Sequence, residues 1–77
     1  MTSVKILLNS IERVKKFVNI VTEFDADMEL VHGRYVIDAK SIMGIFSLDL
    51  SQTVELQIHT DGEDAEHILE QLKEYLV

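Results

Sequence analysis

Histidine is the side chain most often used near neutral pH for acid–base chemistry, metal binding and proton relay, and this chain contains three. His32 lies beside a predicted turn, His59 on the polar side of a predicted strand, and His67 on the polar side of a predicted helix. Their elements and separations give neither a metal triad nor a nucleophile–base pair. None stands at the start of a helix. We therefore expect surface histidines without a catalytic role, and no metal site.

Two serines, Ser10 and Ser41, each precede an apolar periodic segment, where a serine hydroxyl caps the first turn of a helix. Such a cap is worth about 0.5–2 kcal/mol relative to alanine. A phosphate at the same position is stabilised by the exposed backbone amides and the helix dipole. A serine phosphoester is too stable to pass its phosphate on readily, and capping without modification is the ordinary role of a serine at such a position.

Other catalytic chemistry has little support. The chain has no cysteine, which excludes disulfides, cysteine-based zinc sites and thiol catalysis. The acidic cluster Glu63, Asp64 and Glu66 is typical of a solvated first helical turn, where carboxylates interact favourably with the dipole. We expect no enzyme activity and no cofactor.

Composition indicates one small globular domain covering residues 1–77, with 47% hydrophobic and 27% charged residues. The formal net charge of −7 argues against nucleic acid as a partner and favours a neutral or basic protein surface. No apolar run approaches the ~20 residues that cross a bilayer, and the first eight residues do not form a signal peptide. We expect a cytoplasmic protein that binds no membrane.

The first half of the chain is predicted to form a strand, a helix and a hairpin. Alternating apolar residues indicate a strand over residues 3–8. Asn9 or Ser10 then caps a helix over residues 10–23, and Asn9 followed by Glu12 is close to a capping box. The apolar face of this helix is predicted to consist of Ile11, Val14, Phe17, Val18, Val21 and Phe24. Two short strands follow, joined by a tight turn at His32–Gly33.

The second half is predicted to form a short helix, a strand and a longer helix. Ser41 begins a helix of about two turns. Val54, Leu56 and Ile58 alternate with polar residues and give the clearest strand pattern. The last helix has an apolar stripe of Ala65, Ile68, Leu69, Leu72 and Leu76. The order βαββαβα predicts an α+β fold, a four-stranded antiparallel sheet with three helices on one face.

The segment Lys40–Leu48, with the sequence KSIMGIFSL, closely resembles the regulatory-serine segment of the HPr family of phosphocarrier proteins. At constant spacing before it, Phe24, Asp27, Met28 and Leu30 fall where HPr-like chains carry a Phe, an Asp and an alternating apolar pair. The last strand and helix resemble the family more generically, to Val77. The resemblance implies the open-faced β-sandwich that this family adopts.

The same spacing places Ser10 at the position of the family's phosphohistidine. Glu12 then falls at the position of the nearby arginine, and Arg13 at that of the helix-starting proline. Where the family has a Gly-Leu-His-Ala-Arg-Pro-Ala-like run, residues 7–14 have the sequence LLNSIERV. A carboxylate at this place would repel a phosphate. The chain thus resembles the histidine-lacking catabolite-repression HPr-like proteins.

The resemblance also assigns a surface. It places Ser41 at the serine that a dedicated ATP-dependent kinase modifies, and it matches Ile42, Met43 and Phe46 to an apolar patch that docks partner proteins. The alternative for Ser41 is that it only caps the helix. The alternative for the three apolar residues is that they pack on the sheet.

Together these features predict a non-catalytic HPr-like regulatory or partner-binding module related to the sugar phosphotransferase system. Its partner would be a phosphotransferase-system enzyme, HPr kinase or a transcriptional regulator. One alternative is an active phosphocarrier with an unexpected acceptor. Another is a structural module whose sheet edge or open face forms a homo-oligomer.

Overall fold

The order of elements along the chain confirms the predicted βαββαβα arrangement. The computed structural model describes residues 1–77. Its elements are β1 (Thr2–Ile6), α1 (Ile11–Val21), β2 (Met28–His32), β3 (Tyr35–Asp38), α2 (Ile42–Phe46), β4 (Val54–Ile58) and α3 (Gly62–Gln71), followed by a 3-10 turn at Lys73–Tyr75.

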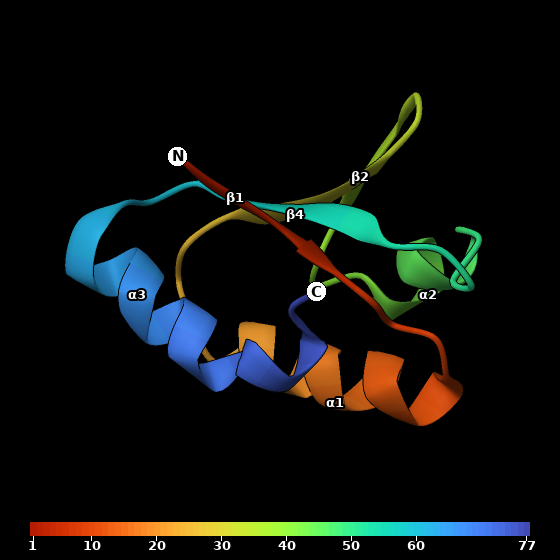
Figure 1. The fold of residues 1–77 in the computed structure, drawn as a ribbon, viewed down its shortest axis with the longest axis horizontal. Helices are drawn as coiled ribbons and strands as arrows, with labels where there is room; N and C mark the ends of the chain where they lie inside the picture. The colour runs from red at the N-terminus through yellow and green to blue at the C-terminus, as the bar shows by residue number, and fades with distance from the viewer.

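The four strands form one antiparallel sheet in the order β1-β4-β2-β3. α1 and α3 lie along one face of this sheet, and α2 lies beside its end (Figure 1). Val54, Leu56 and Ile58 of β4 are buried toward the helices, as predicted. Glu55 and Gln57 alternate with them on the opposite face, which no helix covers. The fold is the predicted open-faced α+β sandwich.

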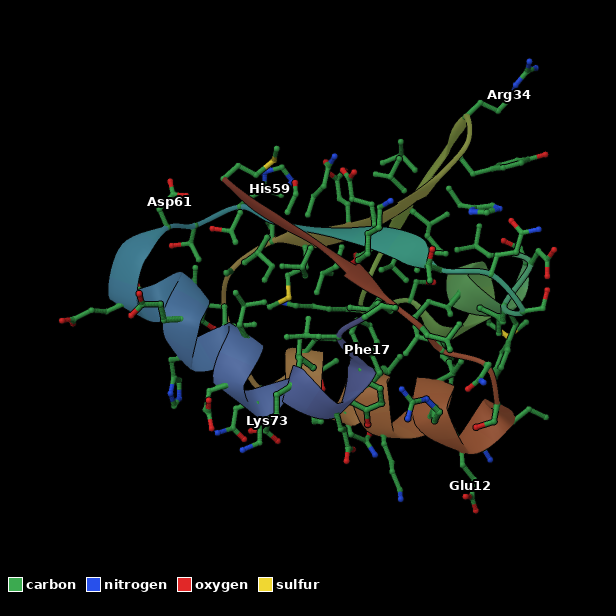
Figure 2. The ribbon with its side chains drawn as sticks, in the orientation of Figure 1. Glu12, Phe17, Arg34, His59, Asp61 and Lys73 are labelled. Atoms are coloured by element: carbon green, nitrogen blue, oxygen red, sulfur yellow. The ribbon has the colours of Figure 1, made fainter.

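The core lies between the sheet and the helices. α1 contributes Val14, Phe17 and Val21, all buried, and Phe17 lies in the layer between α1 and the sheet (Figure 2). α3 contributes Ile68, and Leu72 follows it at the same depth. The apolar periodicity of both helices therefore identified most of the residues that hold them on the sheet.

The β2–β3 hairpin turns at Gly33 and Arg34, one residue later than predicted. His32 pairs with Tyr35 across the turn. Gly33 has a φ of +61°, and a glycine at the first of two turn residues is typical of type II′ hairpins. A side chain at this position would be strained.

Two predicted core positions are wrong. Ile11 is the first residue of α1, and it is exposed rather than part of the buried face. Leu76 is 38% exposed, because α3 ends at Gln71 and the 3-10 turn rotates the chain so that Tyr75 is buried instead. The periodicity of α3 could not predict this change of helix type.

The residues after the 3-10 turn lie along the outer edge of β1. The Leu7 amide donates to the Tyr75 carbonyl at 2.9 Å, and the Val77 amide donates to the Lys5 carbonyl at 3.1 Å. An antiparallel bridge joins Ile6 to Leu76. The Tyr75 ring meets the Phe17 ring edge-on, with centroids 5.9 Å apart. The C-terminal segment thus covers part of one sheet edge.

We predict that Tyr75→Phe keeps or raises stability at neutral pH. The Tyr75 hydroxyl is buried without a hydrogen-bond partner, which is unfavourable for folding. Burial also raises the pKa of this phenol above its ordinary value of 10.0. Because the folded state holds the proton more tightly, stability is complete below pH 10 and falls as the pH rises through the folded pKa.

Chemical denaturation at neutral and alkaline pH checks this. The wild type should lose more stability than Tyr75→Phe as the pH passes 10. A loss of more than about 1 kcal/mol for the variant at neutral pH would show that the hydroxyl makes a favourable hydrogen bond.

Candidate functional site

The starts of α1 and α2 lie at the same end of the molecule, and the two helices contact each other (Figure 1). Three apolar side chains are exposed on these two helices: Ile11 at 63%, Met43 at 78% and Phe46 at 39%. We call these three residues the end patch. Exposed apolar residues on neighbouring elements are typical of an interaction surface.

The structure separates the three residues that the sequence assigned to partner binding. Met43 and Phe46 are exposed, whereas Ile42 is half-buried and packs against the core. Ile11 was missed because its position fitted the apolar spacing of α1. The available signal was its place directly after the N-cap, where the helix has only begun and an apolar side chain can extend past the core.

α2 owes its shape to Ser41, Gly44 and Ile45. The Gly44 amide donates to the Ser41 hydroxyl oxygen at 3.2 Å, which confirms that Ser41 is the N-cap. A β-carbon on Gly44 would lie 3.2 Å from that oxygen, so glycine leaves room for the cap. Ile45 is fully buried and anchors the helix, and Met43 is left pointing outward.

The start of α1 is capped by Ser10 and not by Asn9. The Arg13 amide donates to the Ser10 hydroxyl oxygen at 3.1 Å. The predicted capping box between Asn9 and Glu12 is therefore wrong. Glu12 is exposed in the first turn and forms no ion pair. Its carboxylate is favourable beside the helix dipole but unfavourable beside a phosphate.

Arg13 has a structural role that the sequence did not reveal. Its Nη2 donates to the Leu7 carbonyl at 2.9 Å and to the Glu74 carbonyl at 3.1 Å. The guanidinium carbon lies 4.7 Å from the centroid of the buried Tyr75 ring. Arg13 thus joins the loop before α1 to the C-terminal 3-10 turn, through donors on Nε and Nη2 that bind backbone carbonyls.

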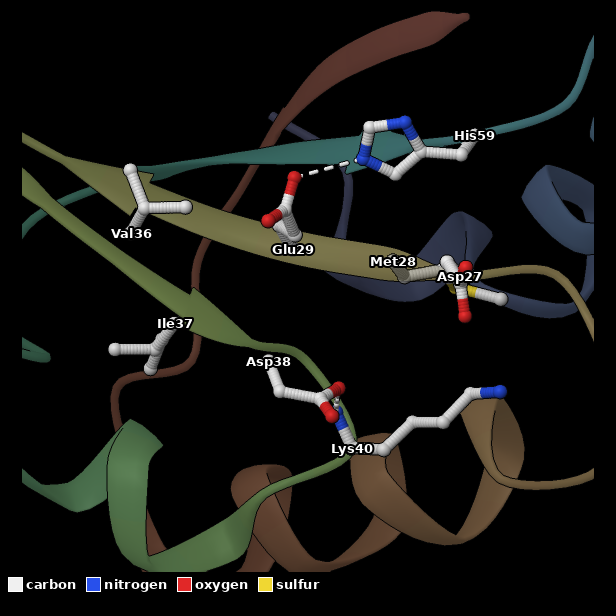
Figure 3. Close-up of a pocket in the computed structure, with 8 residues that line it drawn as sticks. All are labelled: Asp27, Met28, Glu29, Val36, Ile37, Asp38, Lys40 and His59. Carbon is white, nitrogen blue, oxygen red and sulfur yellow. Dashed lines mark hydrogen bonds and ion pairs between the residues drawn. The ribbon is translucent and has the colours of Figure 1, made fainter.

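The histidines lie apart from the start of α1. The His59 Nε2 is 2.7 Å from Glu29 Oε1, and both residues line an open pocket (Figure 3). The His67 ring meets the Phe24 ring edge-on, with centroids 5.6 Å apart. His32 is the last residue of β2. No group of His, Cys, Asp and Glu is arranged to hold a metal ion.

No helix in the structure has the length and apolar character needed to cross a bilayer.

A four-stranded antiparallel sheet with helices on one face and two serine-capped helix starts at one end defines a small open-faced sandwich of the phosphocarrier type. The family model described as "PTS HPr component phosphorylation site" matches residues 13–77. The chain belongs to the HPr family.

Known relatives agree with this assignment. Over 60 residues the chain is 37% identical to the HPr-like protein Crh of Bacillus subtilis (strain 168), covering 78% of this chain and 71% of that protein. The structure of HPr-C-His from Thermoanaerobacter tengcongensis matches with a TM-score of 0.77 and 28% identity, over 96% of this chain and 89% of that one. The phosphocarrier protein HPr of Bacillus anthracis str. Ames matches with a TM-score of 0.70 and 29% identity, over 99% of this chain and 94% of that one.

We predict that Ser10→Ala lowers stability by about 0.5–2 kcal/mol, because the Arg13 amide loses its acceptor. Ser10→Asp keeps an acceptor at the cap and should retain most of the stability. Thermal denaturation of both variants checks this. Equal stability of Ser10→Ala and the wild type would show that the cap contributes nothing.

Proposed function

We propose that this protein is a regulatory member of the HPr family that binds partner proteins in the cytoplasm and does not carry phosphate on a histidine. The observation that carries the proposal is the start of α1. It presents Ser10 and Glu12, and the first histidine of the chain is His32 at the end of β2.

The chemistry of a phosphocarrier supports this view. A carrier must take a phosphate from a donor and release it at similar free energy, which a histidine ring nitrogen achieves through a labile phosphoramidate. The Ser10 hydroxyl would form a stable ester instead. Glu12 adds a negative charge beside it, and the neighbouring Arg13 guanidinium is committed to the Leu7 and Glu74 carbonyls. The match to the family model also begins at Arg13, after Ser10.

The end patch supports a binding role. HPr-like proteins work with phosphotransferase-system enzymes and with HPr kinase, and these are the partner classes that we propose, together with a transcriptional regulator. Met43 and Phe46 offer apolar contact area next to half-buried Ile42. Apolar anchors of this kind contribute most of the affinity in many interfaces when a partner removes them from water.

Ser41 is proposed as the switch of this surface. Its side chain precedes Met43 by two residues, so a phosphate would add about −1.5 to −2 charges beside the end patch. The nearest cation in the sequence, Lys40, does not neutralise this position, because its Nζ donates to the Phe24 carbonyl at 2.6 Å. The added charge would therefore be available to a basic group on a partner.

We predict that the protein takes no phosphate from phosphoenolpyruvate in the presence of enzyme I. No histidine stands at the start of α1 to accept the group, and the Glu12 carboxylate there would repel it. Incubation with labelled phosphoenolpyruvate is the measurement, with the HPr of Bacillus anthracis as the positive control. Stoichiometric label that is labile to acid and stable to alkali is characteristic of phosphohistidine and would contradict the proposal.

We predict that Met43→Glu weakens binding to HPr kinase at least about tenfold while leaving the fold intact, because a charge would be buried unpaired in an apolar contact. Isothermal titration with HPr kinase measures the affinity. Val77→Glu is the matched control, since Val77 is an equally exposed apolar residue outside the end patch.

Two Ser41 variants separate the effect of charge from that of capping. Their affinities are measured by isothermal titration as above, with a transcriptional regulator or phosphotransferase-system enzyme in place of HPr kinase. Ser41→Asp and Ser41→Asn both retain a cap, and only the first adds charge. A change in affinity confined to Ser41→Asp supports the switch. Unchanged affinity for Met43→Glu and Ser41→Asp alike would place the binding surface elsewhere.

A further inference from the structure

The outer edge of β3 is the least protected part of the sheet. β3 is a terminal strand, and the opposite edge strand β1 is partly covered by the C-terminal segment. Tyr35 and Val36 are exposed at 62% and 56%. The hairpin projects away from the helices, and Arg34 extends from its tip into solvent (Figures 1 and 2). An open edge of this kind is a template for pairing with another strand.

The turn fixes which backbone groups of β3 face outward. His32 and Tyr35 close the two-residue turn, and Leu30 pairs with Ile37 further along. In an antiparallel ladder the bonded residues alternate, so the amides and carbonyls of Tyr35 and Ile37 face β2. The backbone amide and carbonyl of Val36 and the backbone amide of Asp38 face the open edge. No turn or loop hydrogen bond uses the Val36 amide or carbonyl.

Charge is distributed along this edge in a self-complementary way. Val36 and Asp38 share one face of β3, and Arg34 is the turn residue directly before the strand, two residues from Val36 on the other side. Neither Arg34 nor Asp38 forms an ion pair within the chain. Asp38 instead lies opposite Glu29 on β2, a pairing of like charges.

Lys40 does not relieve that pairing of like charges. Its side chain extends away from the Asp38 carboxylate toward the end of α1 (Figure 3), where its Nζ binds the Phe24 carbonyl. Lys40 contacts the Asp38 carboxylate through its backbone amide and not through its side chain, and this amide donates to Oδ1 at 2.9 Å. The Asp38 carboxylate therefore has room for a cation from outside the chain.

We propose that this edge binds a second copy of the chain, with β3 antiparallel to β3 and Val36 opposite Val36. In this register Arg34 of each copy faces Asp38 of the other, and Tyr35 faces Ile37. The outward amide and carbonyl of Val36 form a pair of hydrogen bonds with their counterparts. The two sheets become one continuous eight-stranded sheet about a two-fold axis.

Other registers pair the charges poorly. Centring the pair on Asp38 would place the two Asp38 carboxylates opposite each other. Centring it on Ile37 would place Arg34 opposite Lys40 and Asp38 opposite Val36. The register centred on Val36 is the one that satisfies both charged residues. Because the strand has four residues, the contact falls below the ~1,200 Å² of a standard interface, and the dimer forms and dissociates with concentration.

Sedimentation from micromolar to millimolar concentration tests the proposal. The wild type should pass from monomer to dimer. Val36→Pro removes one outward-facing amide and none of the hydrogen bonds between β3 and β2. Because proline is tolerated on edge strands, this variant should fold. It should stay monomeric, since it lacks the amide that the second copy would bind. Circular dichroism checks its fold. A wild type that stays monomeric throughout, or a folded Val36→Pro variant that still dimerises, would overturn the proposal.

Charge reversal tests the register itself. Arg34→Asp and Asp38→Arg should each raise the dimer dissociation constant at least about tenfold, because each homodimer then has like charges opposed. An equimolar mixture of the two variants should dimerise again, since one copy is acidic at both positions and the other basic. Lys15→Asp, the same charge change on exposed α1, should leave the dimer unchanged. A mixture that stays monomeric would contradict this register.

Discussion

The one-sided burial of β4 is the constraint on which the rest of the structure depends. β4 lies between β1 and β2 and pairs with both, and its residues Val54, Leu56 and Ile58 are all buried. A shift of one residue in its pairing would turn these side chains to solvent. Because only one face of the strand is apolar, the helices collect on that face. On that side of the sheet, the starts of α1 and α2 lie at the same end of the molecule (Figure 1).

The end patch and the start of α1 differ in how far the fold itself uses their side chains. Arg13 has become part of the fold, since its guanidinium binds the Leu7 and Glu74 carbonyls and covers the Tyr75 ring. The positive charge of Arg13 therefore stabilises the contact between the loop before α1 and the C-terminal 3-10 turn. Met43 takes part in no such network, and its side chain is exposed on α2.

Most of the fold could be predicted from the sequence because alternation along β4 and the helical spacing of Val14 and Phe17 report burial directly. The errors arose where local geometry overrides periodicity. The 3-10 turn buries Tyr75 in place of Leu76, and the first residue of α1 extends past the core. At the candidate site the serine caps were predictable from residue type. The role of Arg13 was not, because it depends on carbonyls 6 and 61 residues away.

The central claim is that partners bind at the end patch. Backbone resonances of the labelled protein, followed while HPr kinase is added, test it most directly. We expect the perturbed amides to cluster at Ile11, Ser41, Met43 and Phe46. Perturbations confined to the open sheet face, at Glu55, Gln57 and His59, would contradict it.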